Sequence, residues 1–458
     1  MGMKYLLIAT DGVRIRVYRP KFVQMKLFEN EGEEGITPDR ISLEPLDHIR
    51  LDRVDEDYAY IWLDRYLLYR ELQAPTTENF LNTFGKETPV YQQSIGILKD
   101  KWSEVEGQPH VRVLYEEWEK YLEIVYGSRV GEVDLFLRHT YVATLSKLMA
   151  TIFYSAGALP SPDEIVKTLN GEAFREWGIQ NFLETDFFSW ILRIDKEFVV
   201  DFSRHLIDHL RSFDLTQLSE DILKGLYQAL VDPEERHDLG EYYTPDWLAE
   251  SIVRELIVDS EKSVLDPACG SGTFVASVIR MKKKTFKEGG MNETEILETI
   301  LTQVYGVDVH PLAVITSKVN YLLALGDLIQ HKRKSVVIPV FLADSVRLPT
   351  FERLLEGVDV YKFRTDGEEL VVPLSVVKYS HVADGVFNYV KAVVEGDSLP
   401  VDLETNLRNH FNKFGLGDED YSVLVGLIGK LKEFKDKGKD SIWTYILKNI
   451  YCLLYTSP

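Results

Sequence analysis

The spacing of apolar residues near the N-terminus is that of β-strands. Val13, Ile15 and Val17 alternate with arginines directly after an Asp11-Gly12 pair, which predicts a two-residue β-hairpin with one buried face. An isolated hairpin is only marginally stable, so it needs partners from the segment that follows. We therefore expect residues 1–57 to form a small β-rich unit.

From residue 58 to 231, apolar residues recur at spacings of three and four, which predicts a helical domain. The pattern is clearest over residues 61–73, 111–127, 139–157 and 219–232, and Ser219 is expected to cap the last of these helices. Aromatic residues at helical spacing favour a core role over a base-stacking surface. Six positions are concerned: Tyr115, Trp118, Tyr121, Tyr126, Phe153 and Tyr154.

A run of charged and helix-breaking residues at 231–245 predicts a boundary, after which short strands alternate with helices. Strands are expected at 263–265, 304–309 and 336–345. One helix should have Pro245 in its first turn, and a second should end at Gly289-Gly290. A third should begin after an Asn292 cap, and a fourth should run from Pro311 to Gly326. This order predicts an α/β unit with a parallel sheet and right-handed crossovers.

The strongest local signal is the segment SVLDPACGSGTF at residues 263–274. A short strand ends in Asp266, a loop of small residues follows, and a helix begins directly after it. Glycines at 270 and 272 allow the backbone to bend and to approach a ligand closely. The helix behind them offers free N–H groups, so the pattern is typical of a nucleotide-type cofactor loop.

Three strand ends carry carboxylates, Asp266, Asp308 and Asp344, which a parallel sheet brings to one edge. A nicotinamide site requires a third glycine where this chain has Val275, and an acid about twenty residues onward, whereas Asp308 lies farther along, beyond an additional helix. A phosphate-binding P-loop requires a Gly-Lys-Ser/Thr ending, which is absent. These comparisons leave a nucleoside ligand without a pyrophosphate.

Composition narrows the class of protein. The 458 residues carry 52 Lys and Arg against 73 Asp and Glu, a formal charge of -21, which argues against non-specific nucleic-acid binding by the whole chain. The two cysteines, Cys269 and Cys452, provide neither a disulfide framework nor a metal cluster, so we expect a cytoplasmic protein without a metal site. We expect no membrane span, because no apolar run approaches about 18 residues.

Four ordered motifs resemble the S-adenosylmethionine site of adenine-specific DNA methyltransferases, in particular type I modification subunits and single-chain restriction-modification enzymes. They are GEYYTP at 240–245, DPACGSGTF at 266–274, YGVDVHPLA at 305–313 and ADS at 343–345. The resemblance covers about residues 220 to 346. It implies a Rossmann-like methyltransferase core at 232–350, the cofactor S-adenosyl-L-methionine, and methyl transfer to adenine N6 in a restriction-modification system.

The resemblance also implies a role for each matching position. Tyr243, Thr244 and Pro245 would border the methionine end of the cofactor. Asp308 would accept hydrogen bonds from the ribose hydroxyls, and Asp344 would accept one from the adenine amino group. The methionine amino and carboxylate groups would be held by Asp266, Ala268, Gly270, Ser271 and Gly272. One departure is visible, because His310 stands where the family often has a second acid.

The family activates adenine with an Asn- or Asp-Pro-Pro-aromatic motif, and this chain has no two adjacent prolines. We therefore assign no catalytic residue and interpret residues 351–458 as a mixed α/β insertion, truncated before the catalytic loop. Strands are expected near 369–377 and helices near 421–435, where Glu433-Phe434-Lys435 is a solvated helical segment rather than a nuclease motif. The N-terminal hairpin also resembles the end of a nuclease-like domain in single-chain restriction enzymes.

The implied partners are double-stranded DNA with a flipped adenine, and specificity or restriction subunits. A non-catalytic cofactor-binding or assembly subunit is the alternative, since it would lack the loop without truncation. A methyltransferase acting on proteins or small molecules is disfavoured by the Tyr-Tyr-Thr-Pro motif at 242–245.

Overall fold

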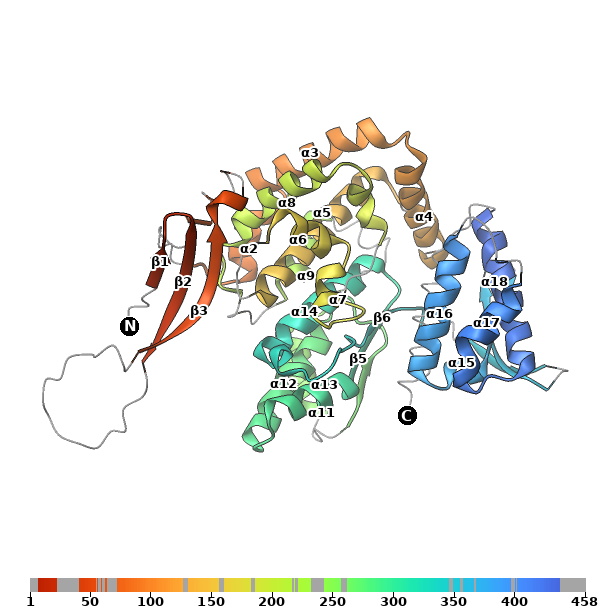
Figure 1. Ribbon diagram of the computed structural model, residues 1–458. Coiled ribbons are helices and arrows are strands. Elements are labelled where there is room, and N and C mark those ends of the chain that lie inside the picture. The colour runs from red at the N-terminus through yellow and green to blue at the C-terminus, as the bar shows by residue number, and fades with distance from the viewer. Residues whose placement is uncertain are drawn as a thin grey trace, which may run out of the picture.

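The computed structural model describes most of the chain as four successive groups of elements (Figure 1). The described residues are 7–22, 41–54, 56, 59, 62–63, 72–126, 131–155, 160–182, 186–215, 218, 221–231, 243–256, 262–345, 349–354, 357–365, 368–396, 400 and 402–436.

The N-terminal group is an antiparallel sheet of β1 (Leu7–Thr10), β2 (Arg14–Phe22) and β3 (Ile41–Arg50), in that order. The predicted hairpin is confirmed, with Thr10 opposite Ile15 and the Asp11 carboxylate accepting from the Val13 and Arg14 amides at 3.0 and 2.6 Å. Strand β3 supplies the expected partner. Ile15 is buried whereas Val13 is 42% exposed, so the buried face begins after the turn rather than at it.

The second group is helical, as the sequence predicts. It consists of α2 (Thr77–Phe84), α3 (Pro89–Val105), α4 (Pro109–Tyr126), α5 (Val133–Tyr154), α6 (Pro162–Leu169), α7 (Glu172–Glu176), the 3-10 helix η3 (Phe187–Arg193), α8 (Lys196–Leu210) and α9 (Ile222–Leu230). Among the six aromatic residues, Trp118 and Tyr121 are buried, and the other four are partly buried and pack against the core. Their predicted core role is confirmed. The helix expected over 61–73 falls largely outside the described residues.

Helix α5 is buried along almost its whole length, which the sequence pattern conceals. Its buried hydroxyls at Thr140, Ser146 and Thr151 donate to the carbonyls four residues earlier at 2.9, 2.7 and 3.1 Å. Polar groups satisfied in this way can occupy a core face. The helix begins at Val133, six residues before the predicted start.

The third group contains a parallel sheet of β4 (Val264–Asp266), β5 (Val304–Asp308) and β6 (Val340–Leu342), in the order β4-β5-β6. Helices alternate with these strands: α11 (Asp246–Leu256), α12 (Thr273–Glu288), α13 (Glu293–Gln303) and α14 (Pro311–Leu325), followed by η5 (Gly326–His331). Strand β6 is shorter than predicted. Pro339 lacks the N–H that would extend the ladder, and only its carbonyl pairs, accepting from Gly306 at 2.9 Å.

Most predicted helix boundaries in this group are confirmed. The Asn292 side chain accepts from the Glu295 amide at 3.0 Å, and Gly290 and Gly326 adopt positive φ just past the helices that they end. Pro245 lies one residue before α11 rather than inside it. Its carbonyl accepts from the amides of Leu248 and Ala249, both at 3.1 Å.

One hydrophobic core joins the helical group to the parallel sheet. Helix α14 lies at the centre of it, packed against α5 on one side and α12 on the other, as Figure 1 shows. By length and composition, the segment Pro311–His331 resembles a membrane span, contrary to the expectation from the sequence. However, 83% of its most apolar window is buried inside the protein, as in a core helix.

The fourth group is an antiparallel sheet of β7 (Thr350–Arg353), β8 (Asp359–Thr365) and β9 (Glu368–Pro373), with helices against it. These helices are α15 (Leu374–Val377), α16 (Ser380–Glu395), α17 (Leu403–Phe411) and α18 (Asp418–Asp436). The strand expected over 369–377 is wrong beyond Pro373, where the proline ends β9 and α15 begins. Glu433 to Lys435 lie in α18, as expected for a helical segment.

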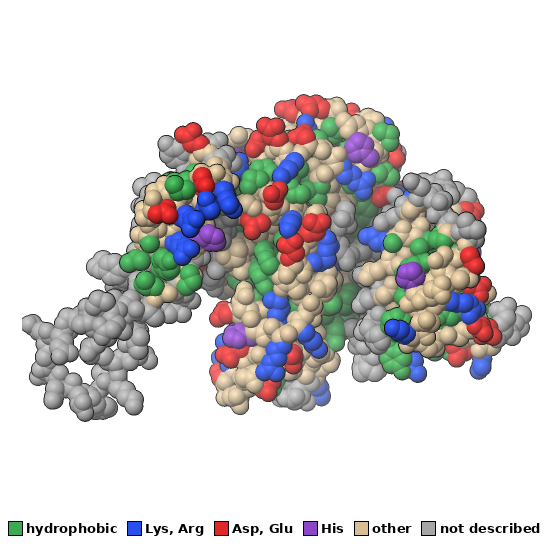
Figure 2. All heavy atoms as spheres, viewed as in Figure 1, with side chains coloured by type: hydrophobic (Ala, Val, Ile, Leu, Met, Phe, Trp, Pro, Cys, Tyr) green, Lys and Arg blue, Asp and Glu red, His purple; other side chains and the backbone are tan. Residues whose placement is uncertain are grey.

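Acidic and basic side chains are interspersed over the face seen in Figure 2. The large negative charge is therefore not gathered into one patch on this face.

Candidate functional site

The loop between β4 and α12 owes its shape to two glycines. Gly270 and Gly272 have φ of +53° and +89°, values that residues with a Cβ rarely adopt. A Cβ on Gly272 would also lie 2.5 Å from Ser317 Oγ of α14, so the loop is pressed against that helix. A Cβ on Gly270 would have the Tyr243 ring as its nearest neighbour, at 3.7 Å. The sequence pattern predicts that the loop backbone approaches a ligand closely. At Gly272, however, the backbone lies close to another part of the protein, helix α14.

Asp308, the last residue of β5, holds this loop in place. Its Oδ2 accepts from the Gly270 amide and its Oδ1 from the His310 amide, both at 2.8 Å. Burial raises the pKa of Asp308, the two backbone bonds oppose that change, and neighbouring Asp266 adds to it. Each carboxylate oxygen has a second lone pair, so the group can still accept from a ligand.

Asp266 and Asp344 lie at the same edge as Asp308. Asp266 ends β4, and its Oδ1 accepts from the Ala268 amide at 3.2 Å, while burial raises its pKa. Asp344 follows β6 by two residues. Tyr121 of α4 donates to the Val309 carbonyl at 2.7 Å, and its pKa is raised by burial and by the carboxylates of Asp308 and Asp344. Parallel pairing of β4, β5 and β6 thus brings the three strand-end carboxylates to one edge of the sheet, as the sequence predicts.

A buried carboxylate at the start of α9 anchors the other side of the loop. Asp221, at the N-cap of α9, accepts from Ser271 Oγ at 2.5 Å and from Thr273 Oγ1 at 2.8 Å through Oδ2. Its Oδ1 accepts from Asn320 Nδ2 at 2.7 Å and from the Lys224 amide at 3.0 Å. One side chain of the helical group thus joins the glycine loop to α14.

The predicted cap of α9 is corrected by the same contacts. Asp221 is the N-cap residue, whereas Ser219 lies outside the described residues. The available clue in the sequence is the acid immediately before an apolar helix, which is also the signature of a cap. Nothing local indicates that Ser271, fifty residues away, donates to it.

Lys224 of α9 positions the segment that precedes α11. Its Nζ donates to the Thr244 carbonyl at 3.0 Å and to Asp246 Oδ2 at 2.8 Å, and its side chain is only 8% exposed. Tyr243 packs edge-on to Tyr227 with 5.9 Å between ring centroids. Together these contacts bring Tyr243 and Thr244 to the glycine loop, while residues 240–242 lie outside the described residues.

His310, the position that departs from the family pattern, caps α14. Its Nδ1 accepts from the Ala313 amide at 3.4 Å, and the buried ring packs edge-on to His139 at 5.2 Å. Burial lowers the pKa of His310 to about 3, so the ring is neutral at physiological pH. An N-cap acceptor is also what an acid would supply here, which explains how histidine can replace one.

The predicted site residues are therefore brought together around one loop, but they differ in how far they are exposed to a ligand. Asp266, Ala268, Pro245 and Thr244 retain exposed surface, whereas the Ser271 hydroxyl is buried and donates to Asp221. Ser271 can meet a ligand through its backbone more readily than through its side chain. The arrangement offers carboxylates and turned backbone at the ends of parallel strands, the usual ligand position in such sheets.

Comparisons with known proteins match the segment that contains this loop. Residues 218–359 match the model of the family described as N-6 DNA Methylase. The type I restriction enzyme EcoEI methylase subunit of Escherichia coli is 31% identical over 122 residues, 26% of this chain and 24% of that protein. The type I restriction enzyme MjaVII methylase subunit of Methanocaldococcus jannaschii is 28% identical over 163 residues, 34% and 25% of the two chains. The matched segment thus spans about a quarter of these relatives.

Solved structures give a looser likeness. A DrdV–DNA complex aligns with 76% of this chain and 31% of its own, at 12% identity and a TM-score of 0.39. The type ISP restriction-modification enzyme LlaBIII bound to DNA aligns with 58% and 18%, at 12% identity and a TM-score of 0.34. The family match and the methylase relatives confirm the resemblance to N6-adenine DNA methyltransferases of restriction-modification systems.

Proposed function

We propose that this chain carries the S-adenosyl-L-methionine-binding half of a DNA methyltransferase that modifies adenine N6 in a specific sequence, within a restriction-modification or related defence system. The observation that carries the proposal is the Asp308 carboxylate, held 2.8 Å from the Gly270 amide at the end of β5, inside the segment matched by the N-6 DNA methylase model. The β4-β5-β6 sheet would be part of a Rossmann-like core over residues 232–350.

Each proposed contact follows from donor and acceptor chemistry. A ribose diol offers two hydroxyl donors, which suits the fixed Asp308 carboxylate, and an adenine amino group is a donor for Asp344. The methionine ammonium would meet Asp266, and its carboxylate would meet the amides of the loop at Ala268, Gly270, Ser271 and Gly272. Tyr243, Thr244 and Pro245 would close the methionine end, held there by Lys224.

Asp221 and Lys224 would act as positioning residues rather than ligands. Asp221 binds the hydroxyls on either side of Gly272, and Lys224 fixes the Thr244 carbonyl. The cofactor would supply an electrophilic methyl group. The residues of this chain would orient it by holding the ribose and the amino acid portion on opposite ends of one loop.

The acceptor side of the reaction concerns the complete protein. We propose double-stranded DNA with a flipped adenine as the substrate, specificity or restriction subunits as partners, and a cytoplasmic location. The helical group over 58–231, the N-terminal unit over 1–57 and the mixed unit over 351–458 would frame the core. The alternative is a non-catalytic cofactor-binding or assembly subunit, which would need no Asn-Pro-Pro-aromatic motif; methylation of adenine in DNA would decide for the enzyme.

The direct test is titration calorimetry with S-adenosylmethionine on wild type, Asp308→Ala and Asp201→Ala. Asp201 is an exposed residue of α8 and provides the matched loss of one carboxylate away from the site. We expect binding by wild type and by Asp201→Ala, and a loss of about tenfold or more for Asp308→Ala, because a hydrogen bond to a charged group contributes about 1.5–3 kcal/mol. Equal affinities for all three proteins would refute the assignment.

A further inference from the structure

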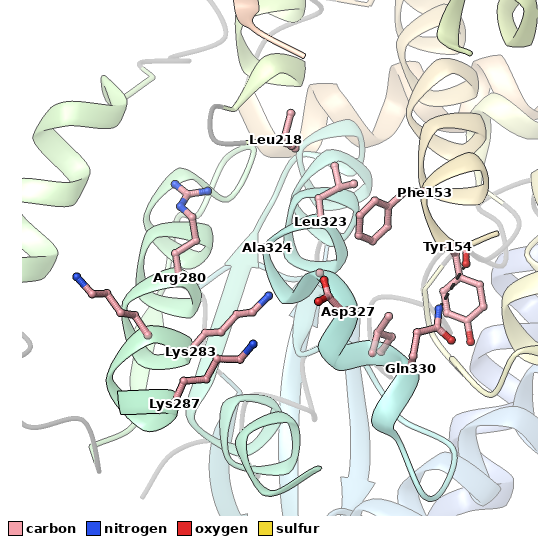
Figure 3. A pocket seen from close by; sticks show the side chains of 13 residues that line it. Phe153, Tyr154, Leu218, Arg280, Lys283, Lys287, Leu323, Ala324, Asp327 and Gln330 are labelled. Atoms are coloured by element: carbon pink, nitrogen blue, oxygen red, sulfur yellow. Dashed lines mark hydrogen bonds between the residues drawn. The ribbon is translucent and has the colours of Figure 1, made fainter. Parts of the chain in front are cut away.

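A cavity lies away from the glycine loop, between the later part of α12, the end of α14 and the end of α5. Its volume is 540 Å³, within the range of about 300–1,000 Å³ typical of small-molecule sites. Figure 3 shows Arg280, Lys283 and Lys287 along α12 on one side and Phe153 and Leu323 opposite them.

The α12 side of this cavity is strongly basic. Arg280, Lys283 and Lys287 follow one another at spacings of three and four, which places them on one face of the helix. Neither Arg280 nor Lys287 forms an ion pair with any residue that the structure describes. Asp327 is the only acid among the described lining residues. In a chain with a formal charge of -21, this is a local excess of positive charge.

Lys283 is fixed at the centre of the basic wall. Its Nζ donates to the Leu325 carbonyl at 2.8 Å, and a Cβ on Gly326 would lie only 2.7 Å from that nitrogen. The glycine, with φ of +60°, therefore leaves room for the ammonium group. Burial and the charge of Lys287 both lower the pKa of Lys283, while Asp327 opposes them. An anion placed between the two ammonium groups would relieve their repulsion.

The opposite wall is apolar and suits the body of an organic ligand. Phe153, Leu218, Leu323 and Ile329 contribute side chains to it. Neighbouring Tyr154 is already committed to other contacts, stacking on Trp177 at 4.5 Å and receiving a hydrogen bond from Lys332 at 2.6 Å. Phe153, by contrast, faces the cavity in Figure 3. An apolar wall opposite clustered cations is the arrangement that a phosphorylated, partly planar molecule requires.

The cavity is separate from the strand-end site. Helix α12 begins at Thr273 beside the glycine loop, and Lys283 lies ten residues further on. At 1.5 Å per residue, this places Lys283 roughly 15 Å along the helix axis from the loop, and Arg280, the α12 residue of the cavity nearest the loop, roughly 10 Å from it. A ligand here would not compete directly with one bound by Asp308.

We propose that this cavity binds a phosphorylated small molecule of nucleotide size, with its phosphates on Arg280, Lys283 and Lys287 and its apolar part against Phe153 and Leu323. The site is independent of the methyl-donor site and goes beyond the function proposed above. Guanidinium and ammonium groups that lack carboxylate partners are the standard means of binding phosphate in proteins.

The test is titration calorimetry on the full chain with GDP and with inorganic pyrophosphate, in the presence of excess S-adenosylhomocysteine so that the strand-end site cannot contribute. The test variant is Arg280→Gln/Lys287→Gln, which leaves the partly buried contact of Lys283 with the Leu325 carbonyl intact. The control is Arg254→Gln/Lys334→Gln, which removes the same charge from exposed positions outside the cavity. Circular dichroism and thermal unfolding verify that both variants fold.

We expect wild type and the control to bind GDP at one site, and the test variant to bind at least about tenfold more weakly, because two charge-assisted contacts to the phosphates are lost. Pyrophosphate should bind more weakly than GDP because it cannot use the apolar wall. Absence of saturable GDP binding, equal weakening in the control, or pyrophosphate binding as tightly as GDP would each overturn the proposal. Binding of a DNA duplex but not GDP through Arg280 and Lys287 would overturn it in favour of a nucleic-acid contact.

Discussion

Removal of the Asp221 carboxylate should weaken the glycine loop more than an ordinary cap mutation does. In Asp221→Ala, the hydroxyls of Ser271 and Thr273, the Asn320 amide group and the Lys224 N–H all lose their acceptor in a buried environment. Breaking a buried charged network by removing one partner costs about 3–5 kcal/mol. The upper limit is reduced because the Ser271 and Thr273 hydroxyls lie 3.5 Å apart and can partly pair with each other.

Asp221→Asn should be milder, at about 1–2 kcal/mol. An amide oxygen can still accept from Asn320 and Lys224, and its NH₂ group can donate to the two hydroxyls after they rotate. The matched control is Asp195→Ala, since Asp195 caps α8 by accepting from the Phe198 amide at 2.7 Å and is exposed, and its only ion pair among the described residues is a surface contact with Lys101. Loss of such a cap costs about 1 kcal/mol.

The assay has two parts. Urea unfolding compares the free energies of unfolding, and amide hydrogen exchange follows the residues from Gly270 to Thr273 directly. Exchange at these amides should rise by roughly a hundredfold in Asp221→Ala and remain near wild type in Asp195→Ala. If Asp221→Ala were no less stable than Asp195→Ala, and the loop amides were equally protected in both, Asp221 would be an ordinary cap and the reasoning would be refuted.

Three other contacts give predictions of their own. Gly272→Ala combines positive-φ strain with a close contact to α14 and should lower the melting temperature well beyond Gly290→Ala, whose added Cβ meets open space; equal shifts would contradict this. His310→Asn keeps an N-cap acceptor but removes a buried ring with a pKa of about 3. As the pH falls below about 6.5, the unfolding free energy of wild type should decrease by about 1.4 kcal/mol per pH unit more than that of the variant, because only the unfolded histidine takes up a proton; parallel pH profiles would disprove this. Lys147→Met breaks the ion pair with Asp186, in which the lysine is 3% exposed, and should cost about 3–5 kcal/mol in urea unfolding. Lys196→Met, which breaks the exposed pair with Asp163, should cost less than about 1 kcal/mol; similar costs would count against the role of burial.

The parts of the site that are local in sequence could be predicted from it. The glycine loop, the strand-end position of Asp308 and the Asn292 cap each depend on residues within a few positions of one another. Positive φ at Gly270 and Gly272 follows from the same short pattern. The turn of the N-terminal hairpin was predictable for the same reason.

The contacts that hold this loop against the helical group could not be predicted in this way. Asp221 meets Ser271 across 50 positions and Tyr121 meets Val309 across 188, and no periodicity links such pairs. Burial of α5 was hidden because its hydroxyls bond to their own helix. The end of β9 was misjudged because apolar residues continue past Pro373, where the proline stops the strand.

The burial of α14 on both sides has a consequence for protein engineering and for the exchange of segments during evolution. Because α5 and α12 pack against the same helix, the parallel-sheet unit and its helical neighbour share one hydrophobic interior. A crossover placed at the boundary near residues 231–245 would separate the two halves of that interior and expose a continuous apolar surface on each. Chimeras of this protein should therefore keep the helical group and the parallel sheet together as a single unit.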